Sequence, residues 1–461
     1  MHAHKKLIAL ALAGAFASGS AAAVDLIAIG TLAMGADKSS ATAGLLENGV
    51  AGNLLGGIGS GLAYAGNGMF IATPDRGPNA SAWNGAIDDT TSYIPRFQSI
   101  SMAISASAPG SALPFAVTPT LTNTTLLSSN TPLTYGPAVP SLNGAGHYYF
   151  SGRSDNFNAS VPSMNPNNAR LDPEGVRVSA DGKSVFVSDE YGPYVYQFDR
   201  ASGQRLRSYA LPANLAVGTL SGKGDTEIAG NTSGRVANKG MEGLAISPDG
   251  KTLVGIMQAN LIQDGKNMLR IVTVDVASGA THEYAYKLTT GSGVSEIVAL
   301  NDHQFLVDER DGKGLGDGSK AVVKQLFMID LAGAADIKDL ASIGAATPVL
   351  GKTLFLDVVP ALLAHGFTAS TIPAKMEGLA FGQDITVGGT VTHTLWLAND
   401  NDFTAAAGDN KFFVFGVTDA DLAHAGATLV PQSIASVPEP QQLGMLLSGL
   451  LLMGVALRRR R

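Results

Sequence analysis

A β-hairpin unit that recurs along the chain constrains its fold more than any other feature of the sequence. Each copy is a short apolar strand, a tight turn and a second strand rich in β-branched and aromatic residues. Such self-similarity indicates a repeat architecture, in which the same small sheet is built several times. The copies begin at Ser60, Glu174, Glu242, Glu296 and Glu377.

Third strands follow four of the hairpins and extend each unit. Asp-Gly pairs at 181–182 and 249–250 close two of the hairpins, because these residues tolerate the positive φ of tight turns. A hairpin, a third strand and a weaker fourth strand make one propeller blade. We therefore predict an all-β protein, a β-propeller of five to six four-stranded blades. The third strands are expected at residues 194–198, 269–274, 325–329 and 412–415.

One further strand pattern, at residues 25–32, belongs to no hairpin. The last unit has only three strands, so pairing this strand with the last blade would close the ring and remove two exposed edges. A stretch rich in Ser, Thr, Pro and Asn, residues 106–168, separates the first two units. We interpret it as an elaborated blade with a surface excursion.

The N-terminal residues 1–23 have the pattern of a secretory signal peptide. Lys5 and Lys6 precede an apolar run at 7–17, and small residues follow it. A buried helix would need polar positions at helical spacing, and this run has none. We predict that the segment is cleaved on export and that residues 24–435 form the propeller domain.

The C-terminal residues 436–461 have three parts in order: Pro-Glu-Pro at 438–440, an apolar segment at 443–457 and four final arginines. This order resembles the PEP-CTERM sorting signal of Gram-negative bacteria, in which the tail is recognised and removed after export. A plain membrane anchor is the alternative, since about fifteen apolar residues make a short span. We expect export and sorting machinery at both termini, membrane contact only through this tail, and a periplasmic, cell-surface or extracellular location.

Composition excludes several partners and sites. The chain has 38 acidic and 31 basic residues, and removing both terminal segments takes away six of the basic ones. An acidic surface argues against nucleic acid as a partner. Because the chain has no cysteine, it has neither disulfides nor thiolate metal sites. We expect a monomer whose core alone holds the fold.

Acidic residues recur at both ends of the repeated hairpins. The start of a blade's first strand and the end of its second lie at the same rim of the channel, so Glu174, Glu242 and Glu377 should meet the acids that end the second strands. Crowded carboxylates repel one another unless a cation or protons neutralise them. Their oxygen ligands favour a hard cation such as Ca²⁺. The acids at the second-strand ends are Asp75, Asp189, Glu190, Asp308, Glu309, Asp400 and Asp402.

Two roles are assigned to this acidic set. An architectural alternative remains for each member, since an Asp after a strand often forms a turn and a Glu before a Gly often bonds the neighbouring blade. The candidate catalytic residues are Glu174, Glu242, Glu377, Asp189 and Glu190. The candidate Ca²⁺ ligands are Asp75, Glu174, Glu242, Glu377, Asp308, Glu309, Asp400 and Asp402.

Four basic side chains belong to the same predicted rim: Arg76, Arg310, Lys239 and Lys375. An arginine presents a fork of donors that suits a phosphate or a carboxylate. We interpret these four as substrate-binding candidates. The alternative is that each arginine neutralises the acid beside it.

Other catalytic patterns are missing from the sequence. It has no Gly-x-Ser-x-Gly elbow at a plausible nucleophile, no His-Glu-x-x-His, no Walker loop and no dinucleotide fingerprint. Its histidines are scattered without ligand spacing, so a histidine-based mechanism is disfavoured.

Six short motifs along the chain, taken together and in this order, resemble the phytase-like, esterase-like propeller family. The resemblance implies a β-propeller and a metal-dependent phosphoesterase that uses bound cations and an activated water. Two departures weaken the match, because Gln258 ends the third unit where others have acids and Ser295-Glu296-Ile297 replaces Glu-Gly-Leu. The motifs are Asp-Arg-Gly-Pro-Asn at 75–79, Asp-Pro-Glu-Gly at 172–175, Ser-Asp-Glu-Tyr-Gly-Pro at 188–193, Met-Glu-Gly-Leu at 241–244 and 376–379, and Asn-Asp-Asn-Asp at 399–402.

Three functions remain open at this point. The first is an exported, cation-dependent phosphoesterase or esterase that acts on a small phosphorylated or ester substrate. The second is a non-catalytic propeller that binds a glycan, peptide or matrix component at the cell surface. The third is a lactonase-type hydrolase with one central Ca²⁺.

Overall fold

The computed structural model describes residues 24–144, 146–160, 163–387 and 389–435. The predicted signal peptide (1–23) and sorting tail (436–461) lie outside the described residues. None of the helices in the described part is long and apolar enough to cross a membrane.

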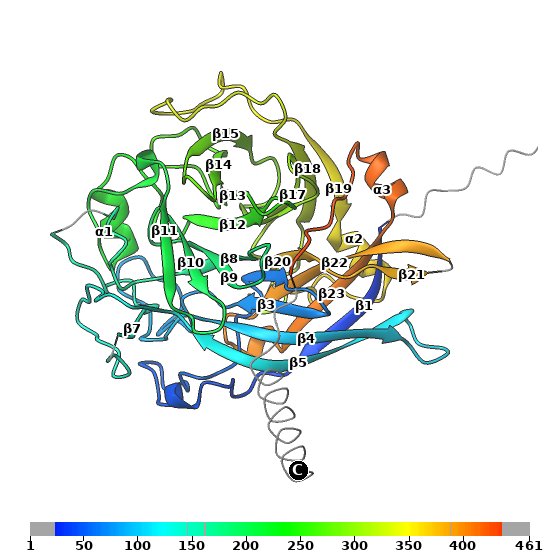
Figure 1. The fold of residues 1–461 in the computed structure, drawn as a ribbon, viewed down its shortest axis with the longest axis horizontal. Coiled ribbons are helices and arrows are strands. Elements are labelled where there is room, and N and C mark those ends of the chain that lie inside the picture. Colours follow the sequence, from blue (N-terminus) through cyan, green and yellow to red (C-terminus); the bar gives the residue numbers. More distant parts are fainter. Residues whose placement is uncertain (1–23, 145, 161–162, 388, 436–461) are drawn as a thin grey trace, which may run out of the picture.

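Five sheets stand around a central axis, which confirms the predicted β-propeller and sets the number of blades at five (Figure 1). The innermost strands of successive blades, β2, β8, β12, β16 and β20, contact one another in a closed ring. The first four blades are β2 (Gly61–Tyr64), β3 (Met69–Thr73), β4 (Arg96–Ala106) and β5 (Phe115–Leu126); β8 (Pro173–Val178), β9 (Ser184–Asp189), β10 (Tyr194–Asp199) and β11 (Arg205–Ala210); β12 (Met241–Ile246), β13 (Thr252–Met257), β14 (Met268–Asp275) and β15 (Thr281–Lys287); and β16 (Gly293–Ala299), β17 (Gln304–Arg310), β18 (Lys324–Asp330) and β19 (Lys352–Asp357).

The fifth blade closes the ring with both ends of the domain. Its strands run from the axis outward as β20 (Lys375–Phe381), β22 (Thr390–Asp400), β23 (Asn410–Val417) and β1 (Asp25–Leu32). β1 pairs with β23, as the sequence predicts; the pairing is antiparallel, with one register shift between Leu26 and Ala28. The short strand β21 (Ile385–Val387) extends the hairpin of β22.

The loops carry little further regular structure. The excursion after the first blade holds one two-stranded ribbon, β6 (Ser128–Ser129) with β7 (Tyr148–Tyr149). The described helices are short: α1 (Gly224–Ala229), α2 (Val358–Ala364) and α3 (Asp419–His424), with 3₁₀ turns at Ser40–Thr42, Ala213–Leu215 and Ala405–Ala407.

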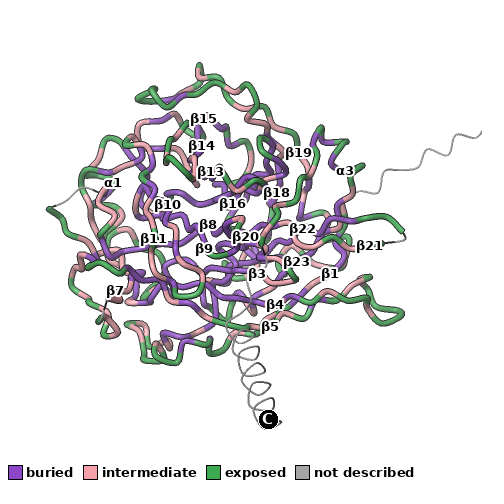
Figure 2. Tube along the Cα trace, viewed as in Figure 1, coloured by how far each residue is buried: buried purple, intermediate pink, exposed green. Residues whose placement is uncertain are grey.

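The core lies between neighbouring blades. The inner and middle strands are almost wholly buried, while exposed residues gather at the periphery of the molecule (Figure 2). Apolar side chains of adjacent sheets interdigitate there; Trp396 of the fifth blade, for example, packs on Phe70 of the first with ring centroids 4.7 Å apart. Packing of this kind, rather than helices or disulfides, holds the ring closed.

Candidate functional site

The recurring glutamates occupy irregular positions in the innermost strands. In β8, β12 and β20 the pairing register shifts at the Glu-Gly step, so that two residues face one on the partner strand. Such bulges re-aim a side chain out of the regular pleat. The bulges bring Glu174, Glu242 and Glu377 close enough to acids at the second-strand ends for these carboxyl groups to shift one another's pKa values. Glu309 is not part of this group.

The glycine that follows Glu174 and Glu242 is required by the close packing of neighbouring inner strands. A Cβ added at Gly175 would lie 2.5 Å from the backbone of Leu244, and one at Gly243 would lie 2.8 Å from Cα of Glu296. Inner strands therefore approach one another too closely for any other residue. The Glu-Gly pair thus combines a functional side chain with a packing requirement of the ring.

A first acidic cluster joins the first and last blades. One carboxylate oxygen each from Asp75, Asp400 and Asp402 lie within 4.8 Å of one another. Lys375 forms ion pairs with Asp400 at 3.0 Å and with Asp402 at 2.5 Å. Burial raises the pKa of Asp75 to about 7, with Asp172 adding to the rise and Arg76 opposing it.

A second acidic cluster lies on the second blade. Oxygens of Asp172, Glu174 and Glu190 also lie within 4.8 Å of one another, and all three side chains are buried. Arg76 reaches this cluster from the first blade, with its Nη1 3.0 Å from Asp172 Oδ2 and its backbone N–H donating to Asp172 Oδ1. Burial raises the pKa of Glu190 to about 8, and Asp172 adds to this rise.

A third group fills the mouth of the channel between the clusters. Arg310 pairs with Glu377 and approaches Glu242 at 3.8 Å. Burial, together with Glu190 and Glu377, raises the pKa of Glu242 well above its ordinary value. Within the described part of the chain, neither oxygen of the buried Asp308 has a hydrogen-bond partner, and Glu242 Oε2 has none either.

These three groups form one acidic rim, and their charges do not balance. Burial first, and then Glu242, Asp172, Glu190 and Asp75, raise the pKa of Glu174, so the clusters lie within electrostatic reach of one another. Among the described residues, nine carboxyl groups stand against three cationic side chains that form ion pairs with them, which are Arg76, Arg310 and Lys375. Burial raises the pKa of Asp308, and Lys324 opposes this rise without forming an ion pair with it. We define the acidic rim as Asp75, Asp172, Glu174, Glu190, Glu242, Asp308, Glu377, Asp400 and Asp402.

Burial and unmatched oxygens make the acidic rim a fit for a hard cation. Ca²⁺ takes six to eight oxygen ligands, and both three-carboxylate clusters offer oxygens at a suitable mutual distance. The oxygens of Asp308 that lack hydrogen bonds are the strongest sign, because a buried charge without a partner is costly.

Three predicted site residues lie differently from the rest. Glu309 points away from the acidic rim and accepts hydrogen bonds from Tyr286 at 2.6 Å and from Thr290 N–H at 2.9 Å. Asp189 accepts from the backbone N–H groups of Asp172 and Tyr191, so it holds the turn that positions its neighbours. Lys239 is exposed.

Sequence reasoning missed three polar contributors to the site. Asp172 was quoted within a motif without a role, although it is the ion-pair partner of Arg76. Asn238 accepts a hydrogen bond from Arg76 Nη1 at 2.6 Å. Its positive φ of 57° shows that the loop has a constrained conformation there, which the sequence pattern does not predict. Ser295 accepts a hydrogen bond from Arg310 Nε. Each is found only through contacts between distant segments.

Arg177 closes the channel below the acidic rim. Its guanidinium donates to backbone carbonyls of three other blades, at Leu62 (2.7 Å), Ile297 (2.7 Å) and Leu379 (3.2 Å). It also forms an ion pair with Glu296 at 3.2 Å. Glu296 therefore belongs to this closure and not to the acidic rim.

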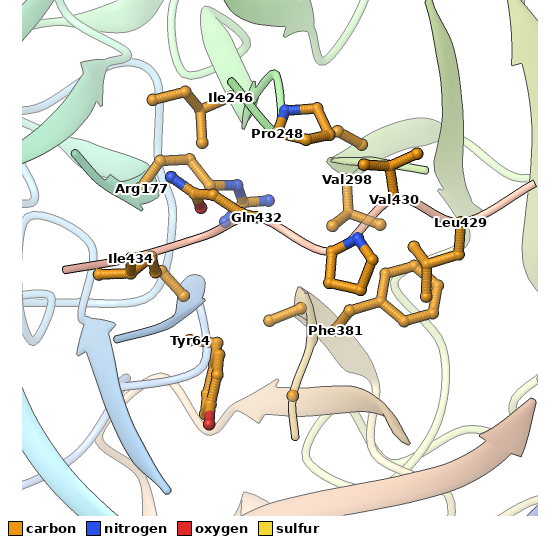
Figure 3. A pocket seen from close by; sticks show the side chains of 15 residues that line it. Tyr64, Arg177, Ile246, Pro248, Val298, Phe381, Leu429, Val430, Gln432 and Ile434 are labelled. Atoms are coloured by element: carbon orange, nitrogen blue, oxygen red, sulfur yellow. The ribbon is translucent and has the colours of Figure 1, made fainter. Parts of the chain in front are cut away.

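The far end of the channel is covered by the segment that follows α3. Val430 N–H donates to Leu300 O at 2.7 Å and Ala435 N–H donates to Ala180 O at 2.8 Å, so the segment joins the fourth blade to the second. Figure 3 shows it crossing over Arg177, with a largely apolar cavity of about 90 Å³ between them. Access to the acidic rim is therefore from the opposite side.

The chain is similar to a known protein family and to a curated relative. Residues 53–403 match the family model described as phytase-like, esterase-like activity of phytase. An uncharacterized secreted protein of Arthroderma benhamiae is 32% identical over 178 residues, which cover 31% of this chain and 34% of that protein. The chain thus spans about a third of the length of this curated relative.

The chain also has a weak similarity to two solved structures. A putative 6-phosphogluconolactonase from Bacteroides uniformis is 12% identical, with a TM-score of 0.30, over 82% of this chain and 93% of its own. The periplasmic gluconolactonase of Pseudomonas aeruginosa is 11% identical, with a TM-score of 0.30, over 78% and 86%.

Proposed function

Because the chain belongs to the phytase-like family with esterase-like activity, we propose that it is an exported hydrolase that cleaves ester or phosphoester bonds of small molecules at the acidic rim, with Ca²⁺ held by its carboxylates. The observation that carries this proposal is the excess of buried carboxyl groups over ion-paired cations at one channel mouth, with six of these carboxyl groups gathered in two compact clusters. Export is supported by the signal-like N-terminus and by the description of the relative as secreted.

The cation ligands are taken from the two compact clusters. Asp75, Asp400 and Asp402 form one set, and Asp172, Glu174 and Glu190 form the other. A bound divalent cation supplies Lewis-acid polarisation of a phosphoryl or carbonyl oxygen and lowers the pKa of a bound water.

Arginines of the rim orient the substrate. The guanidinium of Arg76 is fixed by Asp172 and Asn238, and that of Arg310 by Glu377 and Ser295. An arginine fork held in this way presents donors to a phosphate or carboxylate without further ordering cost. Lys375 pairs with Asp400 and Asp402, so its contribution is to offset their charge rather than to bind substrate.

A glutamate at the channel mouth handles protons. Burial raises the pKa of Glu242, with Glu190 and Glu377 adding to the effect. A carboxyl group that keeps its proton near neutral pH is suited to protonating a leaving alcohol, and its conjugate base to activating water. Glu242 is oriented for this by Gln258, whose Nε2 donates to Glu242 Oε1 at 2.7 Å.

The test is an activity screen of the purified protein. Phenyl phosphate, phytate, phenyl acetate and a lactone are offered with Ca²⁺ and with a chelator. We expect metal-dependent turnover of at least one phosphoester or ester, a loss of about 10²-fold or more in Glu242→Gln, and full activity in Asp249→Asn, which alters an exposed turn. No turnover of any substrate in either condition would overturn the proposal, and calcium binding without turnover would favour the binding protein instead.

A further inference from the structure

A shallow cavity of about 30 Å³ lies beside the acidic rim, between the loops at residues 78–91 and 219–238. Arg76 and Asn238 form its inner side, and Arg76 also pairs with Asp172 of the acidic rim. Arg76 therefore lies both at the acidic rim and in the lining of this cavity, so a ligand group that contacts its guanidinium lies next to the cavity.

Trp83 stands in the outer wall of this cavity with 52% of its surface exposed. Beside it, Ile87 is 42% exposed on the same loop. Large apolar side chains exposed together beside a polar site are typical of a ligand-contacting surface.

The indole is held in place rather than free to swing. A Cβ added at Gly224 would lie 3.0 Å from Cη2 of Trp83, so the ring rests directly on this glycine. The two loops are joined nearby, since Asp225 N–H donates to Gly85 O at 2.9 Å. A fixed, half-exposed aromatic face is a pre-organised stacking platform.

The loop that carries Trp83 is braced from within. Asp89 is only 3% exposed; its carboxylate accepts from Asn84 N–H at 2.9 Å and its carbonyl accepts from Ala80 N–H at 2.6 Å. Thr91 Oγ1 donates to Pro78 O at 2.7 Å. These bonds hold both ends of the segment that presents the indole.

Charges in the floor of the cavity narrow the choice of ligand. Arg170 and Arg235 are buried there and share the single carboxylate of Glu227, at 3.5 and 2.7 Å. Asp89 also lines the cavity, and Arg76 is paired with Asp172, so the three arginines are matched by three carboxyl groups. The floor therefore favours neither a cationic nor an anionic group on the ligand.

We propose that Trp83 binds a neutral aromatic ring of the substrate, attached through the ester or phosphoester oxygen that is released at the acidic rim. This inference rests on the proposed function for the reacting group and adds the class of the alcohol, an aryl or benzyl alcohol. Trp83 is a specificity residue: it contacts the part of the substrate that does not react.

Binding is measured first, with phenylphosphonate and methylphosphonate as probes, because neither contains an ester bond to be hydrolysed. We expect the phenyl compound to bind the wild type about 2- to 12-fold more tightly, the range for one stacked aromatic pair. In Trp83→Ala this ratio falls to about one while methylphosphonate affinity is unchanged. Leu354→Ala, which truncates an exposed side chain on the outer strand of the fourth blade, keeps the ratio.

Tryptophan fluorescence locates the ring independently. The chain has two tryptophans, and Trp396 is fully buried, so a change on adding phenylphosphonate reports on Trp83. We expect the change in the wild type and its loss in Trp83→Phe, with Phe retaining most of the affinity. For phenyl esters that turn over, Trp83→Ala should raise KM with kcat unchanged.

Each outcome separates the two proposals. An intact phenyl-to-methyl ratio in Trp83→Ala, or failure of both phosphonates to bind, overturns the aromatic subsite whatever the activity. A ratio that collapses in Trp83→Ala while no ester is hydrolysed supports the subsite and overturns the hydrolase.

Discussion

The acidic rim should couple the stability of the protein to pH and to calcium. The pKa of Glu190 rises from 4.5 to about 8 on folding, chiefly through burial. The folded state therefore holds this proton more tightly than the unfolded chain, and its stability falls as pH rises from 4.5 to 8. At about 1.36 kcal/mol per pKa unit, this one group costs on the order of 4 kcal/mol at pH 8.

A melting experiment in calcium-free buffer tests this magnitude. About 1 kcal/mol of this is already lost at pH 5, which leaves roughly 3.5 kcal/mol between pH 5 and pH 8. For roughly 410 residues the unfolding entropy is about 0.9 kcal/mol/K, so Tm should fall by roughly 4 °C over this range. Glu190→Gln should recover most of this loss at pH 8 and change little at pH 5. The Gln oxygen can still accept from Gly240 N–H, as Glu190 does at 3.0 Å, so the variant should fold.

Calcium should reverse the loss where the carboxylates are ionised. At a hundred times Kd, a ligand that binds only the folded state adds about 2.7 kcal/mol, or roughly 3 °C here. We expect that shift at pH 8 and less than about 1 °C at pH 5, where protons compete for the same oxygens. Equal calcium shifts at both pH values, or a calcium-free protein that melts higher at pH 8 than at pH 5, would refute the reasoning.

Three further outcomes follow from particular contacts. Glu174→Gln removes one carboxylate of the second cluster and should lose at least half of the calcium-dependent Tm shift in the same melting assay, whereas Glu242→Gln, in which Gln258 can still donate to the side-chain oxygen, should keep most of it. Gly59→Ala should destabilise the protein by about 3 kcal/mol or more in urea unfolding, since the new Cβ would lie 2.0 Å from Asn399 O; a loss under 1 kcal/mol would show that the strands can part. Deletion of β1 exposes the edge of β23, so we expect aggregation of the deletion variant in size-exclusion chromatography, and a stable monomer would contradict the role of ring closure.

Much of the fold could be predicted because each blade repeats one local pattern. The hairpin and the third strand of a blade are encoded in one continuous segment, as at 173–199 in the second blade, and all four expected third strands are present, as β10, β14, β18 and β23. Closure by β1 was predictable from the count of strands in the last unit. The exact number of blades was not, because the fourth strand of the first blade lies in a polar stretch without a clear alternation.

The acidic site was predictable as a set and not residue by residue. Strand residues alternate between two faces, so Asp308 and Arg310 share a face that Glu309 cannot share. The alternation could be read from the sequence, and it places Glu309 on the opposite face of the strand. There its carboxylate accepts a hydrogen bond from Tyr286. By contrast, the contact of Arg76 with Asp172 joins two blades across 96 residues, and nothing local in either segment specifies it.

Glu296 stands at the same position of the repeat as Glu174, Glu242 and Glu377, but its contacts hold the blades together. It follows a serine and lacks the next glycine, and its carboxylate accepts from Leu244 N–H of the third blade at 2.8 Å while it pairs with Arg177. Since Arg177 in turn bonds carbonyls of the first, fourth and fifth blades, this one buried pair connects all five blades at the axis. Breaking such a pair leaves an uncompensated buried charge, so Arg177→Met should cost about 3–5 kcal/mol in urea unfolding. The double variant with Glu296→Gln should recover part of that loss, and a single-variant loss under 1 kcal/mol would mean that packing between blades closes the ring without the pair.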